Sequence, residues 1–356
     1  MMEAEERPVA DRIDDVPLPS ESMFLEGHAE AAQKIASLYK SGTLHHAWLL
    51  SGPRGIGKAT FAFHAARHLL AHPDGASAPD HIDPESWPHN LVRQVAQAAH
   101  PDLLHLTRPW DDKTKRFKTQ VSVDEVRKTQ AFYSMTAGGG GWRITIVDAA
   151  DDMNASAANA LLKILEEPPK RSIFFIVTHA AGGLLPTIRS RCQSLPLKPL
   201  AQDTVGQLLR RFEVQASEQD IDTAARMSEG SVRQAILLSQ KSVLDDYRKF
   251  EALMGEGAAG RSQDWVVAHS VADSVSRRGQ EDAYSLFNQL VLAWIGKQAR
   301  LRENEPLQSL AGWAEVWENA NKSISLADAF NLDKKQVVLD LFSSLFERNR
   351  AGQARA

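Results

Sequence analysis

The stretch SGPRGIGKATF, residues 51–61, decides the fold of the N-terminal half of this chain. Gly52, Gly57 and Lys58 stand at the spacing G-x-x-x-x-G-K, which is typical of a loop that binds phosphate groups. Glycines suit such a loop because they let backbone N–H groups turn inward without side-chain clashes. The stretch therefore predicts a phosphate-binding loop.

The sequence on either side of the loop fits this prediction. The apolar run AWLLSG, residues 47–52, predicts a short buried strand, and apolar residues at helical spacing predict a helix over 58–71. The positive end of that helix would face the phosphate, and Gly55 adds a third glycine to the loop. A simple tight turn is the alternative, and the complete strand–loop–helix context disfavours it.

Two groups that ATP hydrolysis needs are missing around this loop. The residue after the lysine should carry a hydroxyl for Mg²⁺, but it is Ala59, and Thr60 is turned about 100° further around the helix. Asp148 ends an apolar run and could bind a metal, but the next residue, where a glutamate commonly polarises water, is Ala149. We expect little or no hydrolysis, while simple nucleotide binding stays open.

Further apolar runs and helical patterns alternate along the chain. Strands are predicted at 102–106, 142–151 and 172–180, helices at 30–42, 123–135 and 154–169, and a glycine break at 138–141. Continuous apolar strands that alternate with helices favour a parallel, doubly wound sheet. From Pro199 onward the patterns indicate helices alone, so an all-helical remainder follows an α/β head.

The composition sets broad limits. The chain has 356 residues and a net charge of −4, which suit a soluble protein of two or three domains. Its single cysteine, Cys192, excludes an internal disulfide and a four-thiolate zinc site. No run is apolar enough to span a membrane and no signal peptide is evident, so we expect a cytoplasmic protein with no membrane partner.

Two groups of polar residues have alternative interpretations. Residues 113–118 carry four cations, for which a solvated surface loop is favoured over a DNA contact. His64, His68 and His72 share one helical face with Arg67 and could form a row of metal ligands. Because that face lies opposite the apolar stripe, a solvated polar face is favoured and no structural metal is expected.

Two longer motifs indicate a family. IVDAADDMNASAANALLKILEEPP (146–169) and TIRSRC (187–192), together with the phosphate loop, closely resemble the AAA+ subunits of the bacterial sliding-clamp loader of DNA polymerase III. The resemblance implies an α/β P-loop (AAA+) domain with a parallel doubly wound sheet, a small helical lid domain and an all-α C-terminal collar domain. The corresponding boundaries are a flexible N-terminal lead-in at 1–20, then 21–198, 199–243 and 244–356.

The resemblance also assigns site residues. Ser190-Arg191-Cys192 matches a motif whose arginine reaches the ATP of a neighbouring subunit, although by itself Arg191 would suggest a surface ion pair. Thr178 matches the position called sensor 1 and Arg233 the position called sensor 2. Strand-end polarity and a helix surface charge remain equally good interpretations of these two.

The resemblance implies a non-motor subunit of a heteropentameric clamp loader. Its partners would be the motor subunits (gamma/tau) and the clamp-opening delta subunit, and through them the sliding clamp and primed DNA. No cofactor is required, ATP or ADP could be held without hydrolysis, and no zinc is expected because 72–100 lacks the cysteines that many relatives carry. One alternative is an active ATPase motor, in which Thr60 replaces the missing hydroxyl and Asp151 or Asp152 replaces the missing acid. The other is a stand-alone DNA-binding module.

Overall fold

The computed structural model describes residues 8–134, 141–239, 241–255, 257–279, 281–301, 307–330 and 332–353. The chain divides into two compact units. Unit 1 comprises Met1–Phe212 and Glu229–Arg233, and unit 2 comprises Glu213–Ser228 and Gln234–Ala356.

Unit 1 is built on a five-stranded parallel sheet with the strand order β2-β5-β6-β1-β7. The strands are β1 (Ala47–Ser51), β2 (Leu103–Leu106), β5 (Arg143–Val147), β6 (Ser172–Thr178) and β7 (Gln193–Pro196). The three further strands predicted from apolar runs are confirmed. The strand β7 was not predicted, because this edge strand is largely exposed and has no continuous apolar run.

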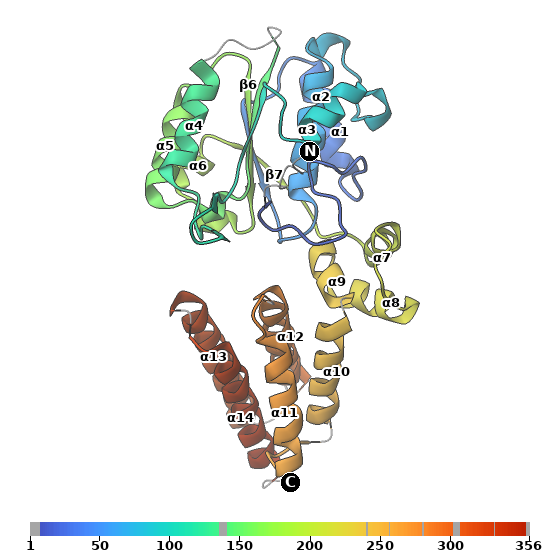
Figure 1. The fold of residues 1–356 in the computed structure, drawn as a ribbon, viewed down its shortest axis with the longest axis vertical. Helices are drawn as coiled ribbons and strands as arrows, with labels where there is room; N and C mark the ends of the chain where they lie inside the picture. Colours follow the sequence, from blue (N-terminus) through green and yellow to red (C-terminus); the bar gives the residue numbers. More distant parts are fainter. Residues whose placement is uncertain are drawn as a thin grey trace. The chain divides into compact units, whose positions relative to one another are not determined.

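Helices cover both faces of this sheet (Figure 1). One face carries α1 (Ala29–Lys40), α2 (Lys58–Ala71) and α3 (His89–Ala96), and the other carries α4 (Val123–Ser134), α5 (Ala155–Glu166) and α6 (Pro186–Arg189). The side chains of β1 alternate between two cores: Trp48 and Leu50 join the first, Ala47 and Leu49 the second. The predicted doubly wound α/β fold is confirmed.

Shorter elements complete unit 1. β3 (Trp110–Asp111) and β4 (Arg116–Phe117) form an antiparallel hairpin, closed by the rings of Trp110 and Phe117 with their centroids 5.0 Å apart. The charged run at 113–118 spans its turn and is mostly exposed, as a surface loop requires. Of the predicted glycine break, only Gly141 is among the described residues. The helix α7 (Gln202–Arg211) also belongs to unit 1.

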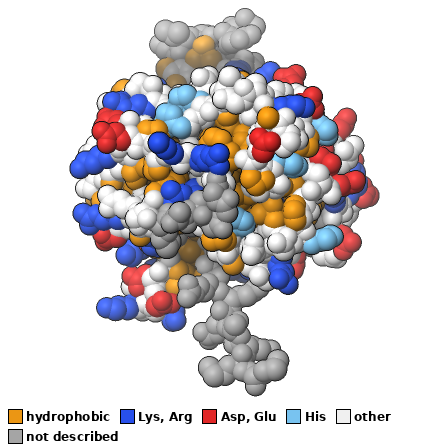
Figure 2. Space-filling view, turned by 90° about the horizontal axis from the view of Figure 1, so that it is seen from above, with side chains coloured by type: hydrophobic (Ala, Val, Ile, Leu, Met, Phe, Trp, Pro, Cys, Tyr) orange, Lys and Arg blue, Asp and Glu red, His pale blue; other side chains and the backbone are white. Residues whose placement is uncertain are grey.

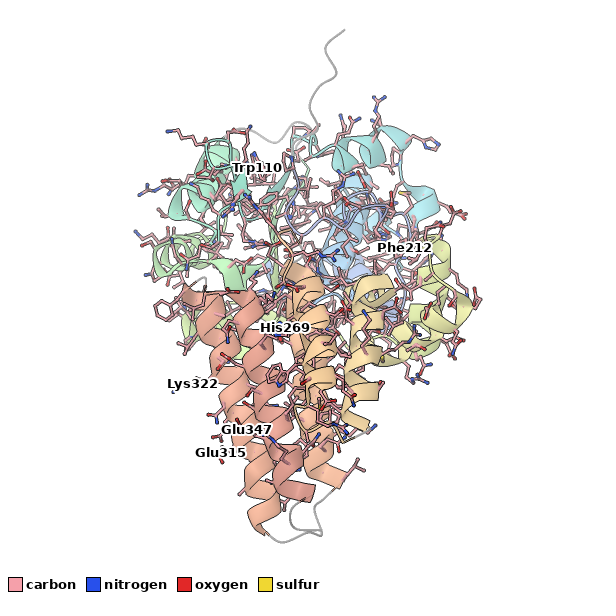
Figure 3. The ribbon with its side chains drawn as sticks, turned by 60° about the horizontal axis from the view of Figure 1, so that its bottom comes forward. Trp110, Phe212, His269, Glu315, Lys322 and Glu347 are labelled. Carbon is pink, nitrogen blue, oxygen red and sulfur yellow. The ribbon has the colours of Figure 1, made fainter. Side chains whose placement is uncertain are left out.

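Unit 2 is helical throughout its described residues, as predicted for the C-terminal remainder. Its helices are α8 (Glu218–Met227), most of α9 (Val232–Ser239), α10 (Lys241–Gly255), α11 (Ser262–Val275), α12 (Glu281–Leu301), α13 (Leu307–Phe330) and α14 (Lys334–Gln353). Aromatic side chains fill the core of its long helices, among them Phe250, Phe287 and Trp313. Glu315 and Lys322 project from α13 into solvent (Figure 3).

The polar face of α2 corrects one interpretation of the sequence. His64, Arg67 and His68 are not solvated but fully buried. The backbone carbonyl of Ser22 accepts hydrogen bonds from Arg67 Nη1, at 2.9 Å, and lies 3.1 Å from His64 Nε2, while the guanidinium sits over the Trp87 ring. The solvated-face interpretation was wrong because segments distant in sequence cover this side of the helix.

The segment predicted as a flexible lead-in, 1–20, is described from residue 8 onward. The carbonyl of Ser20 accepts a hydrogen bond from Arg67 Nη2, and the carboxylate of Asp11 pairs with arginines of unit 1. Residues 8–20 therefore make specific contacts where the sequence indicated none.

Candidate functional site

The glycine-rich loop joins β1 to α2 as the sequence predicted. Three of its glycines have positive φ: Gly52 at 148°, Gly55 at 81° and Gly57, the residue that caps α2, at 96°. Such backbone angles strain other residues. A side chain at Gly55 would also collide with Ser231, since its Cβ would lie 2.4 Å from the Ser231 Oγ.

The lysine of the loop turns back onto the loop itself. Lys58 Nζ donates hydrogen bonds to the carbonyl oxygens of Gly52, at 2.7 Å, and Pro53. The side chain is buried, and burial is the main reason that its pKa falls to about 8, against the opposite influence of Asp148 and Asp151. In this state the ammonium group is bound by backbone oxygens rather than presented to a ligand.

The residues around the loop do not fit a hydrolytic Mg²⁺–ATP centre. Ala59 offers no oxygen next to the lysine, and Ala149 is a buried methyl group where a water-polarising acid would stand. Asp148 follows the end of β5, with its carboxylate 3.7 Å from His105 Nε2. A metal would find one carboxylate here but not the hydroxyl that should complete its protein ligands.

Thr178 at the end of β6 is bound to Asp151. Its hydroxyl donates to Asp151 Oδ1 at 2.9 Å, and the backbone N–H groups of His179 and Ala180 donate to the same carboxylate at 2.7 and 3.0 Å. Burial, the largest influence, raises the pKa of Asp151, but these hydrogen bonds leave the pKa below its ordinary value. Asp152 is paired with Arg108 at 3.2 Å. Both acids offered as substitute metal ligands are thus engaged elsewhere.

Arg233 lies against the loop. Its backbone N–H donates to the carbonyl of Gly55 at 3.3 Å, and Ser231 Oγ donates to the carbonyl of Arg54 at 2.9 Å. The Arg233 guanidinium donates to the backbone carbonyl of Asp11 at 2.6 Å. The structure therefore places Arg233 beside the phosphate loop within unit 1, and its sensor 2 role stays a prediction.

Three residues at this place were missed by sequence reasoning. Asp11 Oδ1 pairs with Arg54 Nη2 at 2.6 Å and with Arg108 Nη2 at 2.9 Å. Burial is the largest influence on Asp11 and raises its pKa, but the arginines Arg54, Arg108 and Arg233 together hold that pKa below its ordinary value. Only Arg54 carried a signal, its place inside the loop; the other two are isolated charges in sequence.

Arg191 and the phosphate loop lie at opposite ends of the parallel strands. Arg191 lies just before β7, a strand parallel to β1, so it is at the amino ends of the strands, whereas the phosphate loop follows their carboxyl ends. Its guanidinium pairs with Glu166, with 2.7 Å between Nη2 and Oε1, and donates to the carbonyl of Thr187 at 3.1 Å. The surface ion pair weighed as an alternative is present.

The neighbours of Arg191 shape the backbone around it. Ser190 Oγ donates to the carbonyl of Thr187 at 3.0 Å and closes the short helix α6. Cys192 is half-buried, and burial raises the pKa of its thiol to about 12. The raised pKa keeps the Cys192 thiol protonated at neutral pH, and Ser190 Oγ is bound to the backbone of α6.

Within the described ranges no three His, Cys, Asp or Glu side chains gather as a metal would require. None of the helices there is both long and apolar enough to cross a bilayer. On the face seen in Figure 2, basic, acidic, histidine and apolar side chains are intermixed rather than forming a patch of one charge.

The fold and the loop together define a P-loop α/β unit followed by a helical unit. Residues 27–201 match the family model described as DNA polymerase III, delta subunit. The DNA polymerase III subunit delta' of Pseudomonas aeruginosa is 33% identical over 232 residues, which are 64% of this chain and 65% of that protein. The subunit delta' of Escherichia coli K12 is 33% identical over 210 residues, 58% of each chain. The matched region of the chain is therefore similar to the clamp-loader subunits of DNA polymerase III, and to proteins named delta' among them.

The matched part spans about three fifths of the length of these curated relatives. A further relative, the DNA polymerase III subunit tau of Escherichia coli K12, is 25% identical over 78% of this chain and 41% of its own length. Among solved structures, a Thermotoga maritima RuvB variant aligns over 94% of this chain and 92% of its own, with 17% identity and a TM-score of 0.41.

Proposed function

We propose that this chain is a non-motor (stator) subunit of the bacterial DNA polymerase III clamp loader. In this role it lends Arg191 to the ATP site of a neighbouring motor subunit and hydrolyses no ATP itself. The similarity to proteins named delta' supports the choice of complex. The position of Arg191 in the sheet supports the choice of role.

The observation that carries this proposal is the separation of Arg191 from its own phosphate loop. The four residues of β7 separate Arg191 from the carboxyl ends of the strands, where the loop lies. At 3.3 Å per residue, this separation is about 13 Å along the strand. The exposed fraction of the Arg191 side chain is 36%, so part of it is open to solvent. This separation supports the proposal that a phosphate bound by Arg191 belongs to another subunit.

A guanidinium suits this task. It is always charged, and its planar fork binds phosphate oxygens in pairs. An arginine supplied from a second subunit accelerates phosphoryl transfer by about 10³–10⁵ in well-studied NTPases, because it stabilises charge that develops on the transferred phosphate. In this chain Arg191 would exchange Glu166 for the neighbour's phosphate.

Partners and compartment follow from the same proposal. The chain would assemble in a heteropentamer with gamma/tau motor subunits and the clamp-opening delta subunit, and would act on the sliding clamp and primed DNA through that complex. The similarity to a subunit tau supports the shared architecture of the ring. We infer a cytoplasmic location, because the proposed complex would act on chromosomal DNA.

Reconstitution tests the proposal. The chain is assembled with gamma/tau and delta subunits, and ATP hydrolysis is measured with clamp and primed DNA. We expect Arg191→Ala to lower the rate at least tenfold with an unchanged unfolding temperature, while the exposed Arg189→Ala, two residues away, retains it. Equal rates for Arg191→Ala and the unaltered chain would refute the trans role.

An active ATPase is the second candidate, and the retained Lys58 and Asp148 are what favours it. The isolated chain should then release phosphate from ATP in a reaction that requires Mg²⁺ and Lys58. We expect no such turnover, because the hydroxyl ligand and the water-polarising acid are both missing.

A further inference from the structure

Four segments far apart in sequence converge beside the phosphate loop. Arg54 comes from the loop, Arg108 follows β2, Arg233 lies in the first turn of α9, and Asp11 comes from the N-terminal segment. Both guanidinium contacts to the Asp11 carboxylate are short, at 2.6 and 2.9 Å to the same oxygen, Oδ1. The third arginine holds the backbone carbonyl of Asp11 at 2.6 Å. All three arginines thus contact oxygen atoms of Asp11.

This arrangement resembles the way proteins bind phosphate. A phosphate presents several anionic oxygens to arginine forks, and a carboxylate is the side chain closest to it in charge and geometry. The loop beside the cluster has the positive-φ glycines of a phosphate cradle, and the Gly55 carbonyl receives the Arg233 N–H. The cluster therefore has the chemistry of an anion site whose present occupant is Asp11.

The charges show what removal of this occupant would leave. Arg54 and Arg108 pair with Asp11, Arg108 also pairs with Asp152, and Arg233 adds a third positive charge that acts on Asp11. Removal of the Asp11 carboxylate would take one negative charge from beside these three arginines. The site would then attract a polyanion more strongly than it does with Asp11 in place.

We propose that Arg54, Arg108 and Arg233 form a binding site for the phosphate groups of a nucleoside triphosphate and that Asp11 occupies this site as an internal competitor. A nucleotide binds when it displaces the segment around Asp11, and Lys58 then exchanges its loop carbonyls for phosphate oxygens. The isolated chain consequently holds nucleotide weakly for two reasons: it lacks a metal ligand at Ala59, and its own carboxylate fills the arginine site.

The test measures nucleotide binding by the full isolated chain. The fluorescent analogue MANT-ATP is titrated against the unaltered chain, Asp11→Asn and the control Asp14→Asn, which removes a charge from the same segment. Asparagine suits position 11 because it tolerates the positive φ of 60° found there. Since each partly exposed ion pair contributes at most about 1 kcal/mol, we expect Asp11→Asn to tighten the dissociation constant about fivefold.

A double variant ties the gain to the arginines. In Asp11→Asn combined with Arg108→Gln the gain should disappear, because the freed site has lost one of its cations. Hydrogen exchange provides a measurement without substitution: saturating pyrophosphate should speed amide exchange in residues 8–16 of the unaltered chain.

Three results would overturn the proposal. They are unchanged MANT-ATP affinity in Asp11→Asn, an equal gain in Asp14→Asn, and a gain for a single-stranded oligonucleotide but not for MANT-ATP. The assay contains no other subunit, so its outcome is independent of the trans role of Arg191.

Discussion

The guanidinium of Arg191 is held by Glu166, with 2.7 Å between Nη2 and Oε1. Glu166 is the last residue of α5, which precedes β6, and Arg191 lies between α6 and β7. Both residues are therefore at the amino ends of the parallel strands. The exposed fractions of the two side chains are 36% and 48%, and an ion pair this exposed contributes less than about 1 kcal/mol. In the proposed trans role, the Glu166 carboxylate would therefore compete only weakly with a phosphate for Arg191.

Glu166→Gln should ease this exchange in the assembled clamp loader. We expect the apparent affinity of the complex for ATP to rise by up to about fivefold, because about 1 kcal/mol of competing attraction is removed. Steady-state hydrolysis at varied ATP concentration measures this effect, with Glu167→Gln on the adjacent exposed residue as the control. A fall in rate like that of Arg191→Ala would show instead that Glu166 positions the arginine.

The buried histidines of α2 predict acid sensitivity of folding. Burial lowers the pKa of His64 and of His68 to about 4, with further lowering from Arg67 for the first and from His72 and His81 for the second. Because the unfolded chain binds these protons near pH 6.5, stability is lost as the pH falls from 6.5 towards 4. Urea unfolding should show a loss of about 2 kcal/mol per histidine between pH 6.5 and pH 5.

The variant His68→Leu separates the contribution of His68 to this pH dependence from that of His64. Neither ring nitrogen of His68 has a hydrogen-bond partner, so an apolar side chain should be tolerated at this position. We expect the variant to show a smaller dependence of unfolding free energy on pH than the unaltered chain. The same dependence in both would mean that His68 does not remain neutral in the folded state.

Gly55→Ala should destabilise unit 1. The new Cβ would lie 2.4 Å from Ser231 Oγ and 2.5 Å from Arg233 Cβ, at a backbone φ of 81°. A loss of about 2–4 kcal/mol is expected in chemical unfolding. Gly182→Ala is the matched control, since no atom lies within 4 Å of its added Cβ, and should change stability by less than about 0.5 kcal/mol.

Restoring the missing motif residues should not create an ATPase. We expect Ala59→Ser combined with Ala149→Glu to leave the isolated chain inactive in a phosphate-release assay. Its own Arg191 lies at the other edge of the sheet, and Lys58 and the arginine cluster are occupied. Turnover that Lys58→Ala abolishes would contradict this explanation.

The sequence by itself determined four of the five strands of the main sheet of unit 1 and several of its helices, in their order along the chain. The helix predicted over 58–71 is found at those residues, and the strand predicted at 47–52 is β1. Both depend on short-range causes: hydrophobic periodicity, glycine at positive φ and the spacing of the loop. For the same reasons, the positions of Gly52, Gly57 and Lys58 around one loop follow from the local sequence alone.

Only the tertiary structure decided which polar residues meet. Arg67 is buried because Ser20, Ser22 and Trp87 cover it, and Asp11 reaches Arg54 and Arg108 across many intervening residues. Likewise, because β7 pairs parallel to β1, Arg191 lies at the opposite end of the strands from the phosphate loop. Such contacts arise when chain segments close over one another, and no local periodicity encodes them, because each residue's own neighbours in sequence are compatible with solvent exposure.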